Sequence, residues 1–213
     1  SFPFTLTGPG FHVTAQVIAP PTNATLLVGD PVQPVVYAAL GPSDGTHPNS
    51  ITALDGATGR ELWSVGTGVI PVTLATSRDG QFLYFTTTSD SSIYRVTVAN
   101  ASISLVTPIV HSTSCSMMSQ RLIVSPDDPH TIALAGECRD GSGGGVTIYD
   151  DSVARPQAAY VGGLSVQILT FGESSSVMYG IVGGALFDIA VNASGAVPGT
   201  RRFIVNGMGG SPE

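Results

Sequence analysis

The chain of 213 residues contains no lysine, and only 11% of its residues are charged. Soluble domains usually contain about a quarter of charged residues, so helices with salt-bridged faces are not expected. All eight basic residues are arginines, and 15 carboxylates give a formal net charge of −7. A surface of this sign repels phosphate backbones, which argues against a nucleic-acid partner.

Long apolar runs and helical periodicity are also absent from the sequence. No apolar run approaches the roughly 18–20 residues of a membrane-spanning helix, so no membrane span is expected. Gly, Ser, Thr and Val are abundant instead, and they favour short strands joined by tight turns. The length allows one domain with a substantial core.

Four segments of the chain resemble one another, each with an apolar strand, a polar turn and a second apolar strand. Matching positions in the four segments are separated by 47, 49 and 46 residues, and they are occupied by Tyr37, Tyr84, Ala133 and Tyr179. The expected inner hairpins cover about residues 25–40, 72–87, 121–136 and 167–182.

A third and a fourth apolar strand follow each hairpin. Four short antiparallel strands per repeat, at a period in the forties, are typical of a β-propeller blade. We therefore predict an all-β fold, a β-propeller with about four blades. The predicted bounds are a lead-in segment with an outer strand (11–19) at 1–20, then the propeller at 21–213, with blades at about 21–68, 69–112, 113–163 and 164–210.

The stretch from Ala53 to Trp63 has the pattern A-x-D-x-x-T-G-x-x-x-W. Its residues suit the hairpin between the third and fourth strands of the first blade. Asp55 can accept hydrogen bonds from nearby backbone N–H groups, and Gly59 can adopt a positive φ. Trp63 then falls on the outer strand, where its ring can pack over a neighbouring blade. We predict a structural motif.

This stretch resembles the tryptophan-docking repeat of pyrroloquinoline-quinone dehydrogenases and their non-catalytic relatives. The segment "SRDGQFLYFT" at 77–86 resembles the turn of YVTN-type surface and periplasmic propellers. The resemblance to the quinoprotein-like/YVTN-type β-propeller superfamily covers about residues 20–205 and implies the fold. The quinone enzymes repeat the docking motif in most blades, whereas it is complete only once here, and no vicinal cysteine pair is present. We therefore predict no quinone or other cofactor.

The two cysteines, Cys115 and Cys138, flank the open end of the third inner hairpin. Antiparallel pairing would bring them into disulfide range, and the bridge would contribute roughly 3 kcal/mol in the entropic account. A disulfide indicates an oxidising compartment, which predicts a secreted or periplasmic protein. Two buried free thiols are the alternative, and a metal site is not expected because no second Cys pair lies nearby.

Loops before the first strand and between the second and third strands of each blade should gather on one rim. The candidate ligand-binding residues on that rim are Asp44, His47, Asp90, His111, Arg139 and Asp140. Two histidines, three carboxylates and an arginine could bind a polar ligand; the alternative is that they are solvated turn residues. Three N-x-[ST] sequons begin at Asn23, Asn100 and Asn192 and matter only in a host that glycosylates them.

The strands expected to line the central channel carry few polar groups beyond Arg121 and Gln167. A propeller enzyme, either a metal-dependent lactonase-type hydrolase or a quinone-dependent dehydrogenase, needs polar groups that converge there. We therefore expect an extracytoplasmic binding or assembly module without catalytic activity of its own, and keep the propeller enzyme as the alternative. A protein or a carbohydrate is the expected ligand.

Propellers of this type usually have six to eight blades, so four blades predict an incomplete ring. The ring would be completed by a second copy of the chain, or by the missing blades of a longer parent protein. Two uncovered sheet faces would forfeit on the order of 10 kcal/mol of apolar burial. The first expectation is therefore a twofold dimer that forms a closed eight-bladed ring, in which the last blade of each copy stacks on the first blade of the other.

Overall fold

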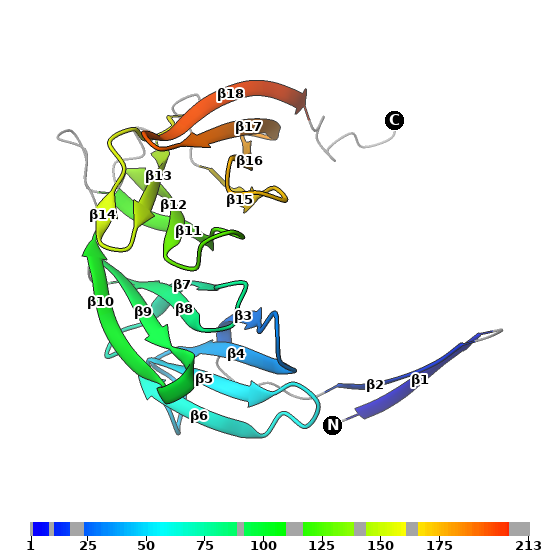
Figure 1. Ribbon diagram of the computed structural model, residues 1–213. Coiled ribbons are helices and arrows are strands. Elements are labelled where there is room, and N and C mark those ends of the chain that lie inside the picture. Colours follow the sequence, from blue (N-terminus) through cyan, green and yellow to red (C-terminus); the bar gives the residue numbers. More distant parts are fainter. Residues whose placement is uncertain are drawn as a thin grey trace, which may run out of the picture.

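The computed structural model describes residues 2–8, 11–17, 24–88, 92–109, 117–138, 144–160 and 166–204, with side chains described in these ranges except at 2–17, 117 and 202–204. Four antiparallel sheets of four strands follow one another along the described chain. They form an open arc, with the first sheet at one end and the fourth at the other (Figure 1). The predicted all-β partial propeller of about four blades is confirmed.

Each blade consists of four strands in chain order. Blade 1 contains β3 (Ala24–Gly29), β4 (Val35–Leu40), β5 (Ser50–Asp55) and β6 (Glu61–Gly66). Blade 2 contains β7 (Pro71–Thr76), β8 (Phe82–Thr87), β9 (Ser92–Thr97) and β10 (Ser102–Pro108). Blade 3 contains β11 (Met117–Val124), β12 (Thr131–Cys138), β13 (Gly144–Asp150) and β14 (Val153–Ala154). Blade 4 contains β15 (Ile168–Phe171), β16 (Val177–Val182), β17 (Ala185–Asn192) and β18 (Gly195–Ile204).

The core lies between the blades, because most second and third strands are apolar on both faces and need a neighbour on each side. Tyr37 packs between blades 1 and 2 with Leu83 and Phe85. Tyr84 occupies the same repeat position and packs between blades 2 and 3. Ala133 does so between blades 3 and 4. The first strands β3, β7, β11 and β15 are neighbours in that order along the concave side of the arc (Figure 1).

The N-terminal strands differ from the expectation. β2 (Phe11–Val17) was expected as an outer blade strand, but it pairs with β1 (Phe2–Gly8) in a separate two-stranded sheet. Gly8 lies opposite Phe11, so the two strands are joined by a very short connection. Pairing between sequence neighbours costs little loop entropy, which favours the local hairpin over a distant blade.

The outer strands of blades 3 and 4 also differ from the expected positions. A fourth strand was expected at 157–163 in blade 3, but β14 ends at Ala154 and only an isolated bridge joins Ala159 to β13. Pro156 lacks an N–H group and interrupts the ladder. The backbone then turns to blade 4, where the Gln157 N–H donates to the Ser194 carbonyl at 2.8 Å. β18 correspondingly begins at Gly195, where a Cβ atom would collide with the Gln157 backbone.

No helix in the described part of the chain is long and apolar enough to cross a membrane.

Candidate functional site

The docking-like motif of blade 1 builds the turn between β5 and β6. Asp55 Oδ1 accepts hydrogen bonds from the Ala57 and Thr58 N–H groups at 3.0 and 2.8 Å, and from the Thr58 hydroxyl at 2.8 Å. The Thr58 hydroxyl and N–H are the main cause of the lowered pKa of Asp55. Gly59 has a φ of 69°, and the Trp63 ring lies 5.7 Å from the Tyr37 ring. Each residue of the motif therefore has a structural role in this hairpin.

Two of the six predicted rim residues, Asp44 and His47, lie in the described part of the chain. Asp44 Oδ1 accepts hydrogen bonds from the N–H groups of His47 at 2.7 Å and Thr46 at 3.0 Å, and these bonds hold the pKa of Asp44 below its ordinary value. The His47 ring lies 3.1 Å from the Glu61 carboxylate. Both side chains therefore have partners within blade 1. The other four candidates, Asp90, His111, Arg139 and Asp140, lie outside the described residues.

Among the described residues, the Arg121 guanidinium that the sequence places at the channel has hydrogen-bond partners within the protein. No group of three or more His, Cys, Asp and Glu side chains within the described ranges could hold a metal ion. Arg121 Nε donates to the Gln167 carbonyl at 2.9 Å, and its Nη1 donates to the Gln120 carbonyl at 3.0 Å. The Arg121 guanidinium thus links blade 3 to the start of blade 4.

Cys138 lies at the end of the third inner hairpin, as expected. Cys138 is the last residue of β12 and lies opposite Met117 in the register of β11. Its sulfur is in a disulfide bond. Cys115 lies outside the described residues.

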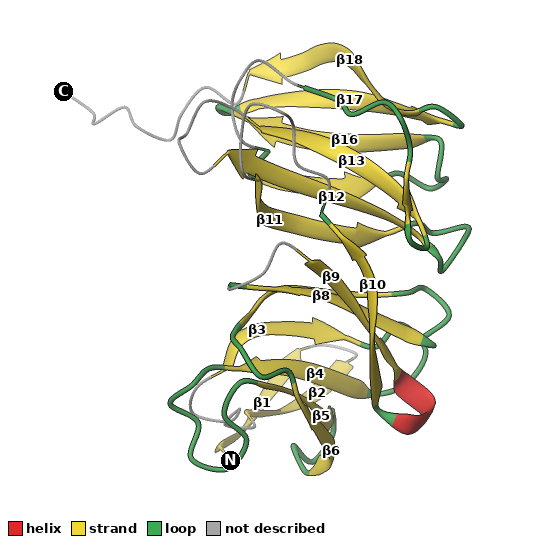
Figure 2. Ribbon diagram, turned by 90° about the vertical axis from the view of Figure 1, so that its left-hand side faces the viewer, coloured by secondary structure: helices red, strands yellow, loops and turns green. Residues whose placement is uncertain are grey.

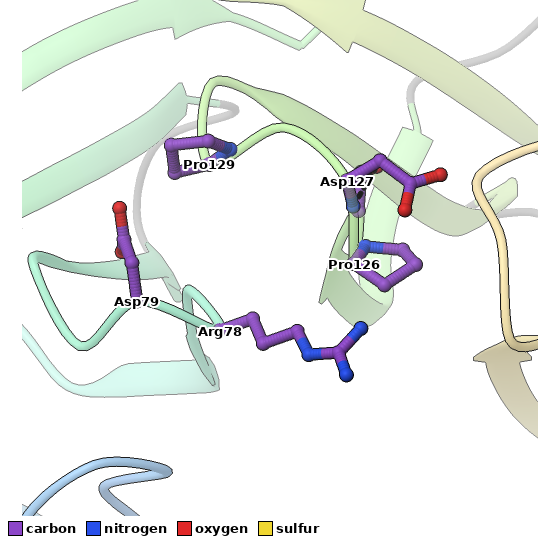
Figure 3. A pocket seen from close by; sticks show the side chains of 6 residues that line it. Arg78, Asp79, Pro126, Asp127 and Pro129 are labelled. Carbon is purple, nitrogen blue, oxygen red and sulfur yellow. Dashed lines mark hydrogen bonds between the residues drawn. The ribbon is translucent and has the colours of Figure 1, made fainter.

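Arg78 is a candidate binding residue that sequence reasoning missed. It lies in the turn between β7 and β8, beside a cavity of about 240 Å³ that also borders Asp79, Ser125, Pro126, Asp127 and Pro129. In Figure 3 its guanidinium extends toward the side of Pro126 and Asp127, away from the side chain of Asp79. Arg78 makes no hydrogen bond or salt bridge within the described part of the protein, but its charge contributes to the lowered pKa of the Asp127 carboxyl. A search of turns as well as strands for cations would have found it.

The two carboxylates at this cavity already serve the turns. Asp79 Oδ1 accepts hydrogen bonds from the Ser77 hydroxyl at 2.6 Å and the Gln81 N–H at 3.0 Å. Asp127 Oδ2 accepts the N–H of Ser175 from blade 4 at 2.7 Å, and this bond is the main cause of its lowered pKa. Their hydrogen bonds hold the turns of blades 2 to 4 in place, which leaves the Arg78 guanidinium as the group available to a ligand.

A wider groove of about 450 Å³ continues from Arg78 along the first strands of the four blades. Its lining is mostly apolar and includes Val28, Leu74, Leu122, Val124 and Phe171. Concave, largely apolar surfaces with few polar groups are typical of ligand sites. The groove could therefore take an apolar ligand or segment with a negative group at Arg78.

The outer face of blade 4, which no fifth blade covers within the described chain, is a second candidate surface. Ile168 is 53% exposed and Tyr179 is 37% exposed. Ile168 lies opposite Ile181, and Ile181 is two residues from Tyr179 on the same strand. Ile168 and Tyr179 therefore lie on the same face of the sheet. Tyr179 occupies the repeat position of Tyr84, which is fully buried and donates its hydroxyl to the Pro129 carbonyl of the next blade at 2.8 Å.

The outer face of blade 1 is only partly exposed. Ala38 and Leu40, on its second strand, are 0% and 1% exposed. They form a small apolar cluster with Leu54. Leu27 lies opposite Ala38 in the register of β3 and β4, yet it is 56% exposed. Apolar side chains are therefore accessible at both ends of the arc, and on blade 1 they include Leu27 on the first strand and Leu62 on the fourth.

These features define the class of the protein as a partial β-propeller. No protein-family model matches the chain, and no curated protein matches it either. Solved propeller structures do resemble it. Hydrazine synthase from Kuenenia stuttgartiensis has a TM-score of 0.66 and 15% identity, with 88% of this chain and 51% of that chain covered. The WD40 domain of Toxoplasma gondii coronin has a TM-score of 0.64 and 12% identity, with 84% and 45% covered.

A third similar structure is the calcium-binding protein regucalcin from Agrobacterium tumefaciens, with a TM-score of 0.56, 12% identity, and 87% and 60% of the two chains covered. At these identities the comparisons support the propeller fold alone. This chain spans about half the length of the propeller structures that it matches.

Proposed function

We propose that the protein is an extracytoplasmic binding and assembly module, without catalytic activity of its own, whose arc of blades is completed to a ring by a second copy. The observation that carries this proposal is the exposure of Ile168 and Tyr179 on blade 4. Blades 1 and 2 use the position of Tyr179 to pack against the blade that follows. Blade 4 therefore presents a face that suits a further blade.

The length of the matched structures supports a ring made of two chains. This chain covers between 45% and 60% of three of them, so two copies approach the length of one complete propeller chain. Two head-to-tail contacts, each between blade 4 of one copy and blade 1 of the other, would close an eight-bladed ring and stop growth at two chains. The exposed Leu27 at the blade 1 end suits this contact.

The groove at Arg78 supports the binding part of the proposal. It faces the concave side of the arc, which becomes the central channel when the ring closes. Its apolar lining and the Arg78 guanidinium favour a protein segment or a carbohydrate with a negative group. Arg78→Ala should weaken such binding without affecting assembly, because Arg78 lies on neither end face.

The extracytoplasmic location rests on the cysteines. Because the chain has only two, we propose a bridge between Cys115 and Cys138. Disulfides persist in oxidising compartments, which suits a secreted or periplasmic protein. Intact-mass measurement after alkylation, with and without a reductant, tests the bridge: two alkylated thiols in the non-reduced folded protein would contradict it.

The self-association is tested by light scattering at micromolar concentration. The wild-type protein should have twice the chain mass of 21.8 kDa. Ile168→Asp and Tyr179→Asp should yield folded monomers, because each places a charge in the contact. Val153→Asp is the matched control: Val153 is 66% exposed on β14 of blade 3, and this variant should remain a dimer.

A folded wild-type monomer would refute the dimer. If such a monomer instead binds additional blades of a longer parent protein, the exposed face belongs to an intramolecular ring. A dimer that survives both Ile168→Asp and Tyr179→Asp would show that the contact lies elsewhere.

A further inference from the structure

Two of the three sequons lie in the same type of turn, between the third and fourth strands of a blade. Asn100 ends the short 3-10 helix η1 (Val98–Asn100) in blade 2, and Ser102 begins β10. Asn192 ends β17 in blade 4, and Ser194 lies just before β18. Figure 2 shows η1 and the turn between β17 and β18 on the same side of the molecule. The third sequon, at Asn23, lies outside the described residues.

Each asparagine uses its side-chain oxygen to hold the turn. Asn100 Oδ1 accepts hydrogen bonds from the Ser102 hydroxyl at 2.7 Å and the Ser102 N–H at 3.2 Å. Asn192 Oδ1 accepts the N–H groups of Ser194 at 2.8 Å and Gly195 at 3.2 Å. Both asparagines are exposed. Neither side-chain Nδ2 makes a hydrogen bond within the described structure, so both amide nitrogens are open to solvent.

The turns themselves do not require an amide nitrogen. In blade 1 the equivalent turn is held by Asp55, whose Oδ1 accepts hydrogen bonds from Ala57 and Thr58 in the same way. A carboxylate is therefore sufficient, and an asparagine oxygen adds nothing to the turn that Asp55 lacks. The Nδ2 groups of Asn100 and Asn192 are left without a structural role, at the atom that N-glycosylation modifies.

We propose that Asn100 and Asn192 are N-glycosylation sites. The proposal rests on the extracytoplasmic location proposed above, because the modification requires entry into a secretory compartment. The donor is an oligosaccharide linked to a polyprenyl pyrophosphate. C1 of its first sugar forms a bond to Nδ2 while the C1–O bond breaks. The polyprenyl pyrophosphate leaves with that electron pair, and Nδ2 loses one proton to a base.

The position of the two turns makes them accessible to a transferase on the folded protein. Both lie at exposed ends of strands, and the residues between asparagine and serine, Ala101 and Ala193, are small. Ala101 has a φ of 51°, a left-handed conformation that turns the chain sharply between Asn100 and β10. Two polar glycans would cover one edge of the arc, away from the concave groove.

The test is expression of the full chain behind a secretion leader in a glycosylating eukaryotic cell, followed by peptide mass spectrometry with and without peptide:N-glycosidase. We expect glycans at both asparagines, and conversion of each modified asparagine to aspartate by the glycosidase. Ser102→Ala should abolish modification at Asn100 alone, whereas Ser102→Thr should retain it. Ser194→Ala and Ser194→Thr form the same pair for Asn192.

A folded, secreted chain with both asparagines unmodified would overturn the proposal, and so would modification at Asn23 alone. Modification that persists in Ser102→Ala would show that the sequon is not what is recognised. Light scattering on the enzymatically deglycosylated protein tests the ring separately. If a protein that carried both glycans is still a monomer after their removal, the proposed assembly is contradicted but the proposed glycosylation sites are not.

Discussion

The two ends of the arc have different outer faces. On blade 1 the central side chains Ala38 and Leu40 are buried, and exposure is high at Leu27 on the inner edge. On blade 4, Tyr179 of the second strand and Ile168 of the first strand are both exposed. The second strand of blade 1 is therefore buried on its outer face, whereas the second strand of blade 4 is exposed there. Exposed apolar side chains are thus present at both ends, with Leu27, Val32 and Leu62 on blade 1 and Ile168 and Tyr179 on blade 4.

The interior blades show what the open end lacks. Tyr84 and Tyr179 occupy one repeat position, but within the described chain only Tyr84 has a following blade, and it is fully buried. An unsatisfied blade face is thus recognised by comparing equivalent positions, because the amino acid is the same and only the neighbour differs. This comparison supports the proposed contact surface at Tyr179 over a singly exposed apolar residue.

The largest expected effect separates the two ends directly. Leu40→Ala, on the closed face of blade 1, should reduce the free energy of unfolding by about 2–5 kcal/mol, since it leaves a cavity among buried side chains. Tyr179→Ala, on the open face of blade 4, should change the unfolding free energy of the monomer by less than about 1 kcal/mol. Urea denaturation at concentrations that keep the chain monomeric measures both values.

The control for this pair is the concentration dependence of stability. If blade 4 is the contact, the wild-type denaturation midpoint should rise with protein concentration, and that rise should disappear in Tyr179→Ala. If Leu40→Ala and Tyr179→Ala lose equal unfolding free energy under monomeric conditions, the difference in burial between the two end faces is contradicted.

Sequence patterns located the blades better than they located the site. The inner hairpins follow from apolar strands at a regular spacing, since a blade cannot bury its faces without that pattern. The position of the outer strand of blade 3 could not be predicted from the spacing. Pro156 interrupts the strand, and Gln157 pairs with Gly195 of blade 4, which is distant in sequence. Arg78 was missed because it lies in a turn, while the channel was sought on strands alone.

Side-chain exposure was the least predictable feature. Tyr37, Tyr84 and Tyr179 look alike in the repeat, and nothing local distinguishes the one that has no following blade. The roles of Asp44 and His47 also depend on geometry, because a loop carboxylate can hold its own turn as readily as it can bind a ligand. Position in the ring therefore decides what each equivalent residue does.

A smaller effect is expected at Trp63, on the face of blade 1 that packs against blade 2. Its ring packs beside Tyr37 against blade 2. Trp63→Phe should cost about 1 kcal/mol of unfolding free energy, because an aromatic ring remains in place. The variant should retain dimerisation, since this face already has its neighbour. Stoichiometric binding of pyrroloquinoline quinone that depends on Trp63 would contradict the structural role of the motif.

The smallest effect concerns the pH dependence of stability at Asp30, in the turn between β3 and β4 of blade 1. Burial raises the pKa of Asp30, but the Tyr37 hydroxyl at 2.6 Å and the N–H groups of Val32 and Gln33 outweigh it, and the net pKa is lowered from 3.8. A carboxyl whose pKa is lower in the folded state stabilises the fold above its unfolded pKa. This contribution is lost as the pH falls through the folded pKa. The turn of blade 4 contains a hydroxyl pair, Ser174 and Ser176 at 2.8 Å, which does not titrate in this range.

Asp30→Asn should therefore lower stability near neutral pH by less than about 1 kcal/mol, the scale of a partly exposed charged contact. In acid, below the folded pKa of Asp30, the variant and the wild-type protein should have nearly equal stability, because the wild-type carboxyl is then also neutral. Urea denaturation midpoints across about pH 2–7 measure the difference. Ser174→Ala is the matched control at the other end of the arc, and its stability difference from wild type should not change with pH. A difference for Asp30→Asn that grows as the pH falls would show that the carboxylate does not stabilise this turn. It would also remove the contrast between a first turn held by a carboxylate and a last turn that contains a hydroxyl pair.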